Sequence, residues 1–365
     1  IPFCSSICNY CNFNRGLLDH PLKRRYISAL TAEIERAGDG SKVDTIYFGG
    51  GTPSLLFEEE VEDVLRACQK SFDVSPDVEV TLEMNPETVN RNYVASILDT
   101  GVTRVSIGVQ SFNDCELERL GREHTAETAV DAFSSARSAG CDNVSLDLML
   151  SLPEQTLQRW ARSIEQLVQL SPDHASLYIL ELYPNAPLGS DMSKKGWSLP
   201  KEDDAALMYL EALERTDACG LEQYEISNLA RSGKRSRHNL KYWEDGSWLG
   251  FGCGAHSTRG GWRWRNLSET ESYVDRIERS ADVVLERRLL GEQERIGDAL
   301  FMGLRLVEGL DLVRIRQRYG IDVMERYGEE LRKYIDSGVL VESENRLRLT
   351  RQGMLVANEV MSTFV

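Results

Sequence analysis

The sequence predicts an α/β fold, a partial TIM-like (βα)6 barrel followed by a smaller α+β C-terminal region with a winged-helix-like end. Short apolar runs alternate with amphipathic helical patterns through the first half of the 365-residue chain. Such repeating βα units form a parallel sheet, and six of them fall short of the eight that close a barrel. A stretch rich in Pro, Gly and charge then interrupts the pattern near residue 184.

Five apolar runs are the predicted strands of the barrel, and the opening residues of the chain supply a sixth. The runs are 44–48 (DTIYF), 78–83 (VEVTLE), 104–109 (RVSIGV), 143–148 (NVSLDL) and 175–180 (ASLYIL). Helical patterns lie between them, as in residues 58–72, where Val61, Val64 and Cys68 share one face. Cys68 is therefore predicted to be a core residue.

The rest of the chain is predicted to form two further regions. Residues 1–183 make the partial barrel, residues 184–290 a linker with an aromatic and basic α+β region, and residues 291–365 a helical, winged-helix-like domain. Within the last, VLVESENRLRLT predicts a hairpin with Glu344 and Asn345 in its turn. We expect this end to have a structural role.

Composition limits the classes of function. Apolar residues make up 41% of the chain and charged residues 27%, which is typical of a soluble globular protein. A formal net charge of −16 argues against nucleic acid as a partner. No apolar run is long enough for a membrane span, and eight cysteines are too few and too uneven for a secreted disulfide framework. We therefore expect a cytoplasmic protein.

Three cysteines stand close together in the opening segment IPFCSSICNYCNF. Cys4, Cys8 and Cys11 would supply three thiolates to a 4Fe-4S cluster, which leaves one iron open to a ligand. The alternatives are a zinc site completed by a distant Cys or His, or simply buried thiols.

A glycine run follows the first of the five predicted strands, in YFGGGTPSLL. Gly50, Gly51 and the adjacent Thr52 stand where a parallel strand would end. Glycines let the backbone approach a ligand closely, and we expect the amides of this run to donate to polar groups of a ligand. Tight turns use the same residues, so the run alone is weak evidence.

Three polar residues accompany the apolar strands: Glu83, Gln110 and Asp147. Inward-pointing polar groups cost free energy unless they are paired. Either they pair with arginines such as Arg104 and Arg122, or they face a polar ligand. Their common position at predicted strand ends favours the ligand.

Together these motifs resemble the radical S-adenosylmethionine enzymes, and within them the oxygen-independent coproporphyrinogen III oxidase-like group. The resemblance also rests on TLEMNPE, SIGVQSFND, LGREHT, DLMLSLPEQT, RHNLKYW and LGFGCGAH. It implies a 4Fe-4S cluster on the three cysteines, with S-adenosylmethionine on the open iron and a 5′-deoxyadenosyl radical on one-electron reduction. The implied cofactor contacts are Gly50, Gly51 and Thr52 with the methionyl part, Glu83 with the ribose, Arg122 with the carboxylate, Gln110 and Asp147 with other polar groups, and Tyr10 with the adenine.

Two branches of that group differ at positions this sequence contains. The oxidases, or dehydrogenases, carry a further cysteine where Phe13 stands here, whereas HNLKYW resembles the HN-x-x-YW pattern of the haem chaperone (HemW) branch. The resemblance therefore favours a protein that binds haem and passes it to an unidentified acceptor protein, with a one-electron reductant needed only if radical chemistry occurs. For a haem chaperone we assign no catalytic residue. The alternative function is the oxidative decarboxylation of coproporphyrinogen III.

The segment from residue 231 to 265 is basic and aromatic, in contrast to the acidic chain. It holds eight Lys and Arg residues against two acidic ones, and four of the six tryptophans. Such a surface suits an apolar macrocycle with two propionates, although the aromatics would equally pack one region on another. The resemblance favours haem at His238, Tyr242 and Trp243, with His238 as axial ligand and Arg235 and Arg237 at the propionates.

A second pair of possible metal ligands, Cys253 and His256, lies in GCGAH. The glycines around them favour a packing turn over a metal site.

Overall fold

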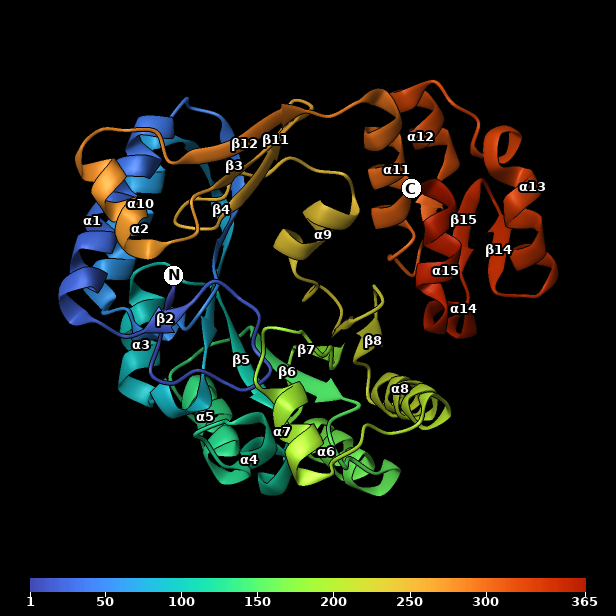
Figure 1. Ribbon diagram of the computed structural model, residues 1–365, viewed down its shortest axis with the longest axis horizontal. Coiled ribbons are helices and arrows are strands. Elements are labelled where there is room, and N and C mark those ends of the chain that lie inside the picture. The colour runs from blue at the N-terminus through green and yellow to red at the C-terminus, as the bar shows by residue number, and fades with distance from the viewer.

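The structure is a computed structural model that describes residues 1–365 (Figure 1). Its main sheet has the strand order β3-β4-β5-β6-β7-β9-β8. The first five strands are parallel, β9 is antiparallel to β7, and β8 is antiparallel to β9. The sheet is open between β3 and β8, so the predicted partial barrel is confirmed. The strands are β3 (Lys42–Phe48), β4 (Asp73–Met84), β5 (Arg104–Gln110), β6 (Val144–Leu150), β7 (His174–Ile179), β8 (Glu222–Gln223) and β9 (Asn228–Ala230).

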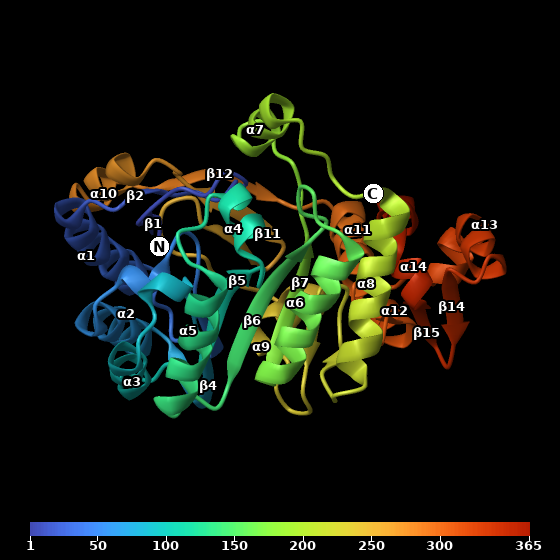
Figure 2. The ribbon, with the colours of Figure 1, turned by 90° about the horizontal axis from the view of Figure 1, so that it is seen from below.

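Helices cover the outer face of this sheet, as Figure 2 shows for α5 and α6. Their apolar faces pack on the strands, and Cys68 of α2 is buried as predicted. Trp160 of α6 is also buried, and its indole N–H donates to the carbonyl of Met208 at 2.7 Å, which ties α6 to α8. The helices up to residue 217 are α1 (His20–Ala37), α2 (Glu58–Ser71), α3 (Arg91–Asp99), α4 (Asp114–Leu120), α5 (Ala126–Ser138), α6 (Leu157–Leu170), α7 (Leu188–Lys195) and α8 (Glu202–Asp217), with short turns η1 (Pro53–Leu55) and η2 (Pro86–Thr88). Of these, α7 projects beyond the strands and does not cover the outer face (Figure 2).

The opening residues do not form a sixth strand of the main sheet. Instead, β1 (Phe3–Cys4) pairs in parallel with β2 (Gly16–Leu17) as a separate two-stranded sheet. The same segment is held against the glycine run after β3, because the Gly51 amide donates to the carbonyl of Ile1 at 2.8 Å and the Thr52 amide to that of Phe3 at 2.7 Å. Apolar character alone could not distinguish these two arrangements.

Residues 184–290 contribute to the main sheet as well as forming a part of their own. Strands β8 and β9 come from this region, so the boundary predicted at residue 183 falls within the unit that builds the sheet. The remainder holds α9 (Arg237–Trp243), an antiparallel sheet of β10 (His256–Arg259), β11 (Trp262–Asn266) and β12 (Val284–Leu289), and α10 (Thr270–Glu278). Arg25 of α1 pairs with Asp275 and Glu278 of α10, each at 2.7 Å.

The C-terminal region combines helices with a three-stranded sheet of order β13-β15-β14. The predicted hairpin turn is confirmed, because Glu344 and Asn345 have φ values of 52° and 62°, the pair of left-handed residues that a two-residue hairpin turn needs. None of the chain's helices combines the length and the apolarity needed to span a bilayer. The elements are α11 (Glu292–Gly303), β13 (Leu310–Asp311), α12 (Leu312–Tyr319), α13 (Val323–Asp336), β14 (Leu340–Ser343), β15 (Arg346–Leu349), α14 (Arg351–Leu355), α15 (Ala357–Met361) and η3 (Ser362–Phe364).

Candidate functional site

One cavity of about 410 Å³, here called the barrel cavity, lies on the inner side of the open sheet. Its walls come from the opening loop, from the ends of β3 and β4, and from the inner face of β5, β6 and β7. It brings together every residue that the sequence assigned to the cluster and to S-adenosylmethionine. These are Cys4, Tyr10, Cys8, Cys11, Gly50, Gly51, Thr52, Glu83, Gln110, Arg122 and Asp147.

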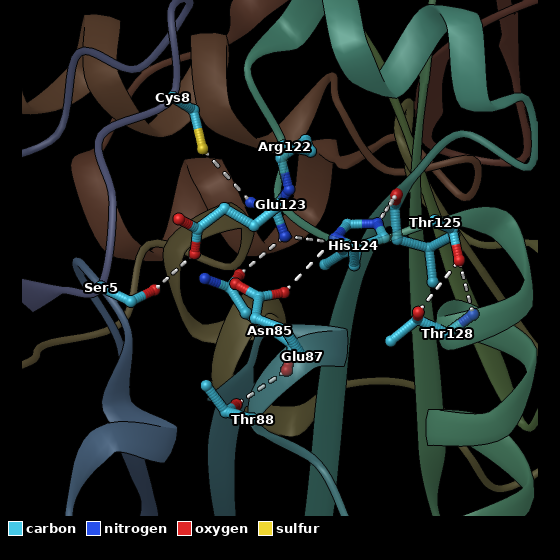
Figure 3. Close-up of polar contacts among 12 residues, drawn as sticks. Ser5, Cys8, Asn85, Glu87, Thr88, Arg122, Glu123, His124, Thr125 and Thr128 are labelled. Atoms are coloured by element: carbon cyan, nitrogen blue, oxygen red, sulfur yellow. Dashed lines mark hydrogen bonds and ion pairs between the residues drawn. The ribbon is translucent and has the colours of Figure 1, made fainter.

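The three cysteines of the opening segment are free thiols at one end of the barrel cavity. Cys4 ends β1 and is buried, whereas Cys8 and Cys11 lie half-buried in the loop that follows. Burial raises the pKa of the Cys4 and Cys8 thiols. Arg122 lies beside them, with Nη1 3.5 Å from the sulfur of Cys8 (Figure 3).

This arrangement fits an iron-sulfur cluster. No three Cys, His, Asp or Glu side chains are arranged to hold a single metal ion. In a 4Fe-4S cluster each thiolate binds a different iron, so the three sulfurs need not converge on one point. The Arg122 guanidinium would compensate part of the negative charge that thiolates and sulfides carry.

The glycine run has a different local role from the one predicted. Gly50 has φ +118°, and a Cβ on Gly51 would lie 2.7 Å from the carbonyl oxygen of Phe3 and 3.0 Å from the sulfur of Cys4. The amides that we expected to face a ligand are used within the chain, that of Gly50 by Glu83 at 3.2 Å. No protein group donates to the carbonyl oxygens of Gly50 and Gly51, so carbonyls rather than amides are free for a ligand.

Two half-buried carboxylates line the barrel cavity without pairing with an arginine. Glu83, near the end of β4, accepts hydrogen bonds from the Tyr47 hydroxyl at 2.6 Å and from the Gly50 amide. Asp147 lies in the middle of β6 and not at its end as predicted, because the strand continues to Leu150. Its oxygens accept from Ser106 at 3.1 Å. Burial raises the pKa of both carboxyl groups.

Arg122 and Gln110 complete the polar wall near the cysteines. Arg122 follows α4, and its Nη2 donates to Asn85 Oδ1 and to the carbonyl of Gly108, both at 2.9 Å (Figure 3). Its buried Nε has no partner. Gln110 ends β5 in a left-handed conformation, with φ 66°, which turns the chain at the cavity wall. Both residues therefore lie where a polar ligand would meet them.

A second cavity, of about 650 Å³, lies at the free edge of the sheet beside β3, and we call it the edge cavity. It is lined mainly by apolar side chains of α1, α2 and β3 and by residues 247–251. His238 and Tyr242 of α9 line it, and so does His256. Trp243 does not: its ring lies near the C-terminal helices, with the Arg305 guanidinium 4.3 Å from its centre.

His238 is held by contacts on both ring nitrogens. Nδ1 lies 3.0 Å from the Thr45 hydroxyl and Nε2 lies 2.9 Å from the Tyr242 hydroxyl. The ring stacks on Tyr47 with centroids 4.9 Å apart. Burial lowers the pKa of His238 to about 4, and the nearby charge of Lys241 adds to that effect. The imidazole is therefore neutral at pH 7.

The two arginines expected at haem propionates lie outside the edge cavity. Arg235 pairs with Glu308 at 2.9 Å, and Arg237 pairs with Asp77 at 3.4 Å. Neither side chain lines the cavity, although Arg237 also lies 3.8 Å from Asp44, which does.

Three other cations line the edge cavity: Lys42, Lys241 and Arg259. Lys241 pairs with Asp44 at 2.6 Å and Arg259 with Asp39 at 2.7 Å. Lys42, which begins β3, is exposed. These are the positive charges available to an anionic group there.

The GCGAH segment is a packing turn. Gly252 has φ +95°, and a Cβ there would lie 2.2 Å from the Tyr26 hydroxyl oxygen. The sulfur of Cys253 lies 3.3 Å from the Asn14 side-chain amide, whereas His256 is exposed. Only glycine allows so close an approach of this segment to α1.

Sequence reasoning missed one residue that links the two cavities. Tyr47 of β3 lines both the barrel cavity and the edge cavity. Its hydroxyl bonds Glu83 on one side, and its ring stacks on His238 on the other. Its place directly before the FGGG run was the available signal.

Comparisons with known proteins agree with this geometry. Residues 1–167 match the model of the Radical SAM superfamily, and residues 290–356 match that of the HemN C-terminal domain. The chain is 35% identical over 370 residues to "Heme chaperone HemW" of Bacillus subtilis, covering 100% of this chain and 97% of that protein. It is 33% identical to the bovine "Radical S-adenosyl methionine domain-containing protein 1, mitochondrial", covering 99% and 85%.

A solved structure shares the fold. The coproporphyrinogen III oxidase HemN of Escherichia coli, described as a radical SAM enzyme, matches with a TM-score of 0.86 and 22% identity, over 100% of this chain and 88% of that one.

Proposed function

This chain belongs to the radical SAM superfamily and, within it, to the HemW family, and from that premise we propose that it is a haem chaperone. It would bind haem and pass it to an acceptor protein. The observation that carries the proposal is the edge cavity, which has apolar walls, a neutral half-buried imidazole and lysine and arginine side chains. Its volume of about 650 Å³ is in the range of small-molecule and cofactor sites.

Membership of the superfamily implies a 4Fe-4S cluster and S-adenosylmethionine. We assign both to the barrel cavity, where the cluster would supply one electron to the sulfonium of the cofactor. The chain's own groups would hold and orient the cofactor and exclude water from it. The assigned contacts are Cys4, Cys8 and Cys11 for the cluster, and Gly50, Gly51, Thr52, Glu83, Arg122, Gln110, Asp147 and Tyr10 for S-adenosylmethionine.

His238 is the proposed axial ligand of haem. A ligating histidine commonly donates its second N–H to a fixed acceptor, which orients the ring. The Thr45 hydroxyl, 3.0 Å from Nδ1, is placed for that role. Nε2 would then bind iron in place of its present contact with the Tyr242 hydroxyl.

Titration of haemin into the purified chain, followed by its Soret band, tests this assignment. His238→Ala should weaken binding about tenfold or more, because the iron loses its nitrogen ligand. Tyr242→Phe should preserve or strengthen binding, because it removes the group that competes for Nε2. His256→Ala is the matched control, since His256 lines the same cavity but is exposed. Loss of binding in the His256 variant alone would disprove the ligand assignment.

Oxidation of coproporphyrinogen III remains the second candidate, because the HemN structure shares this fold. Phe13 stands where the oxidases carry a further cysteine, and its side chain is 68% exposed at the barrel cavity. We expect the reconstituted chain to bind S-adenosylmethionine without decarboxylating coproporphyrinogen III in an anaerobic assay. Formation of protoporphyrinogen at rates of an enzyme would replace the chaperone proposal with the oxidase.

A further inference from the structure

Arg104 is a buried arginine without a partner. It begins β5, its side chain is 2% exposed, and it lines the barrel cavity. It forms no ion pair or hydrogen bond, and its Nε is buried without an acceptor. Arg122, in the same cavity, donates to two oxygens. A buried guanidinium without an acceptor destabilises the folded chain, and an anionic ligand would offset that destabilisation.

The neighbouring carboxylates do not satisfy Arg104. Asp147 is the acidic group on the adjacent strand, and its oxygens are bonded by serine hydroxyls, those of Ser106 at 3.1 Å and Ser145 at 3.4 Å. Glu83 is bonded by the Tyr47 hydroxyl and the Gly50 amide. Neither lies within 4 Å of the guanidinium, so both acids have donors and the arginine has no acceptor.

A second unpartnered donor lines the same cavity. Asn239 of α9 lines the barrel cavity, and its side-chain amide makes no hydrogen bond within the chain. The adjacent His238 lines the edge cavity instead. The helix thus lines the edge cavity through His238, Lys241 and Tyr242 and the barrel cavity through Asn239, which lines it together with Arg104.

We propose that Arg104 and Asn239 form a carboxylate-binding site at the floor of the barrel cavity. A guanidinium presents two parallel N–H groups that match the two oxygens of a carboxylate, and the Asn amide adds a further donor. Asp147 and Glu83 nearby disfavour a dianion such as phosphate. The site is distinct from Arg122, because Arg122 donates to the carbonyl of Gly108, which lies four residues beyond Arg104, about 13 Å along β5 at about 3.3 Å per residue.

Sodium propionate is the first probe, on the cluster-reconstituted full chain. It should raise the melting temperature of the parent protein above that in sodium chloride of equal ionic strength. Arg104→Met should raise the Kd for propionate at least tenfold, and Asn239→Ala several-fold. Without propionate, Arg104→Met should melt at the same temperature as the parent or higher, because a desolvated charge is removed. Arg235→Met, which alters an exposed ion pair, is the control.

A purely structural role would give the opposite result. If Arg104 only balances Asp147, Arg104→Met lowers the melting temperature, Asp147→Asn in the same chain restores it, and propionate affects neither protein. That outcome overturns the proposal and leaves the haem chaperone proposal untouched, since no haem is used.

Matched ligands distinguish two sources of the physiological carboxylate. It is either a propionate of haem or the carboxylate of S-adenosylmethionine, and in the second case that carboxylate contacts Arg104 in place of the Arg122 contact assigned above. S-adenosylmethionine is compared with its decarboxylated form, and haemin with its dimethyl ester, on the parent and on Arg104→Met. The source is the ligand that binds Arg104→Met more weakly than the parent, provided that its matched form without the free carboxylate binds both proteins equally. Unchanged affinities for all four ligands, with no response to propionate, would also overturn the proposal.

Discussion

The barrel cavity and the edge cavity lie on opposite sides of Tyr47 and differ in how their polar groups are satisfied. In the barrel cavity Arg104 lacks an acceptor, and one nitrogen of Arg122 is also unpaired. In the edge cavity both nitrogens of His238 have partners, and Lys241 pairs with Asp44. A site for a polar ligand therefore has polar atoms without partners in the chain. A site for an apolar ligand has satisfied polar atoms and is recognised by its apolar lining.

The largest expected effect separates the two cavities completely. Cys8→Ala should abolish the cluster, because the opening segment supplies only three thiolates and the variant leaves two. The parent should hold about four irons per chain. Cys68→Ala is the matched control, since Cys68 lines only the edge cavity. Iron and sulfide analysis after anaerobic reconstitution measures both. Stoichiometric zinc without iron in the parent would refute the cluster.

A smaller effect should follow from Arg122→Gln. The charge-assisted contact to the cofactor carboxylate is lost, which weakens S-adenosylmethionine binding by about 1.5–3 kcal/mol. Equilibrium dialysis of the reconstituted protein measures the change. Haem affinity should stay unaltered, because Arg122 does not line the edge cavity. A loss of haem affinity of similar size would mean that the two cavities are one functional site.

The stability of the folded protein should depend on pH through His238 in the edge cavity. Its pKa is about 4 in the folded protein, against an ordinary value of 6.5. Between pH 6.5 and pH 4 the unfolded chain binds a proton at this residue that the folded chain does not bind. The contribution of His238 to the free energy of unfolding is therefore complete above pH 6.5 and is lost as pH falls toward 4. Urea midpoints between pH 7 and pH 4.5 should fall less in His238→Gln than in the parent. Replacing the exposed His20 should leave the profile of the parent unchanged.

The smallest effect is expected for Arg235→Ala. Its ion pair with Glu308 is exposed, with side chains 48% and 58% accessible, and such pairs contribute about 0–1 kcal/mol. Haem affinity should barely change, whereas Lys42→Ala, at the edge cavity itself, should weaken it. If haem affinity fell more in Arg235→Ala than in Lys42→Ala, the propionates would bind at the arginines that the sequence suggested.

Much of the barrel was predictable because local patterns encode it. The alternating apolar runs gave the partial barrel, and Glu344 and Asn345 gave the hairpin turn, since both features depend on neighbours in the sequence. Gly50, Glu83 and Gln110, assigned to the cofactor, line one cavity because the parallel strands β3, β4 and β5 end at a common edge.

Other features depend on partners that are distant in the sequence. The Gly51 amide meets the carbonyl of Ile1, and Trp243 turns toward Arg305. The periodicity of a short helix such as α9 does not say which of its faces meets which cavity. Likewise Arg104 appears in the sequence as a ready partner for acids, and only the packed interior shows that serines and a tyrosine occupy those acids instead.

The position of Tyr47 has a thermodynamic consequence. A ligand that takes over the Glu83 carboxylate competes with the Tyr47 hydroxyl, and the same ring supports the His238 imidazole. Any change of affinity transmitted through this ring must be equal in both directions, because binding free energies around a closed cycle sum to zero. The factor by which a filled barrel cavity alters binding in the edge cavity is then the factor by which a filled edge cavity alters retention in the barrel. Release of a ligand from one cavity would thus change the affinity of the other cavity for its own ligand.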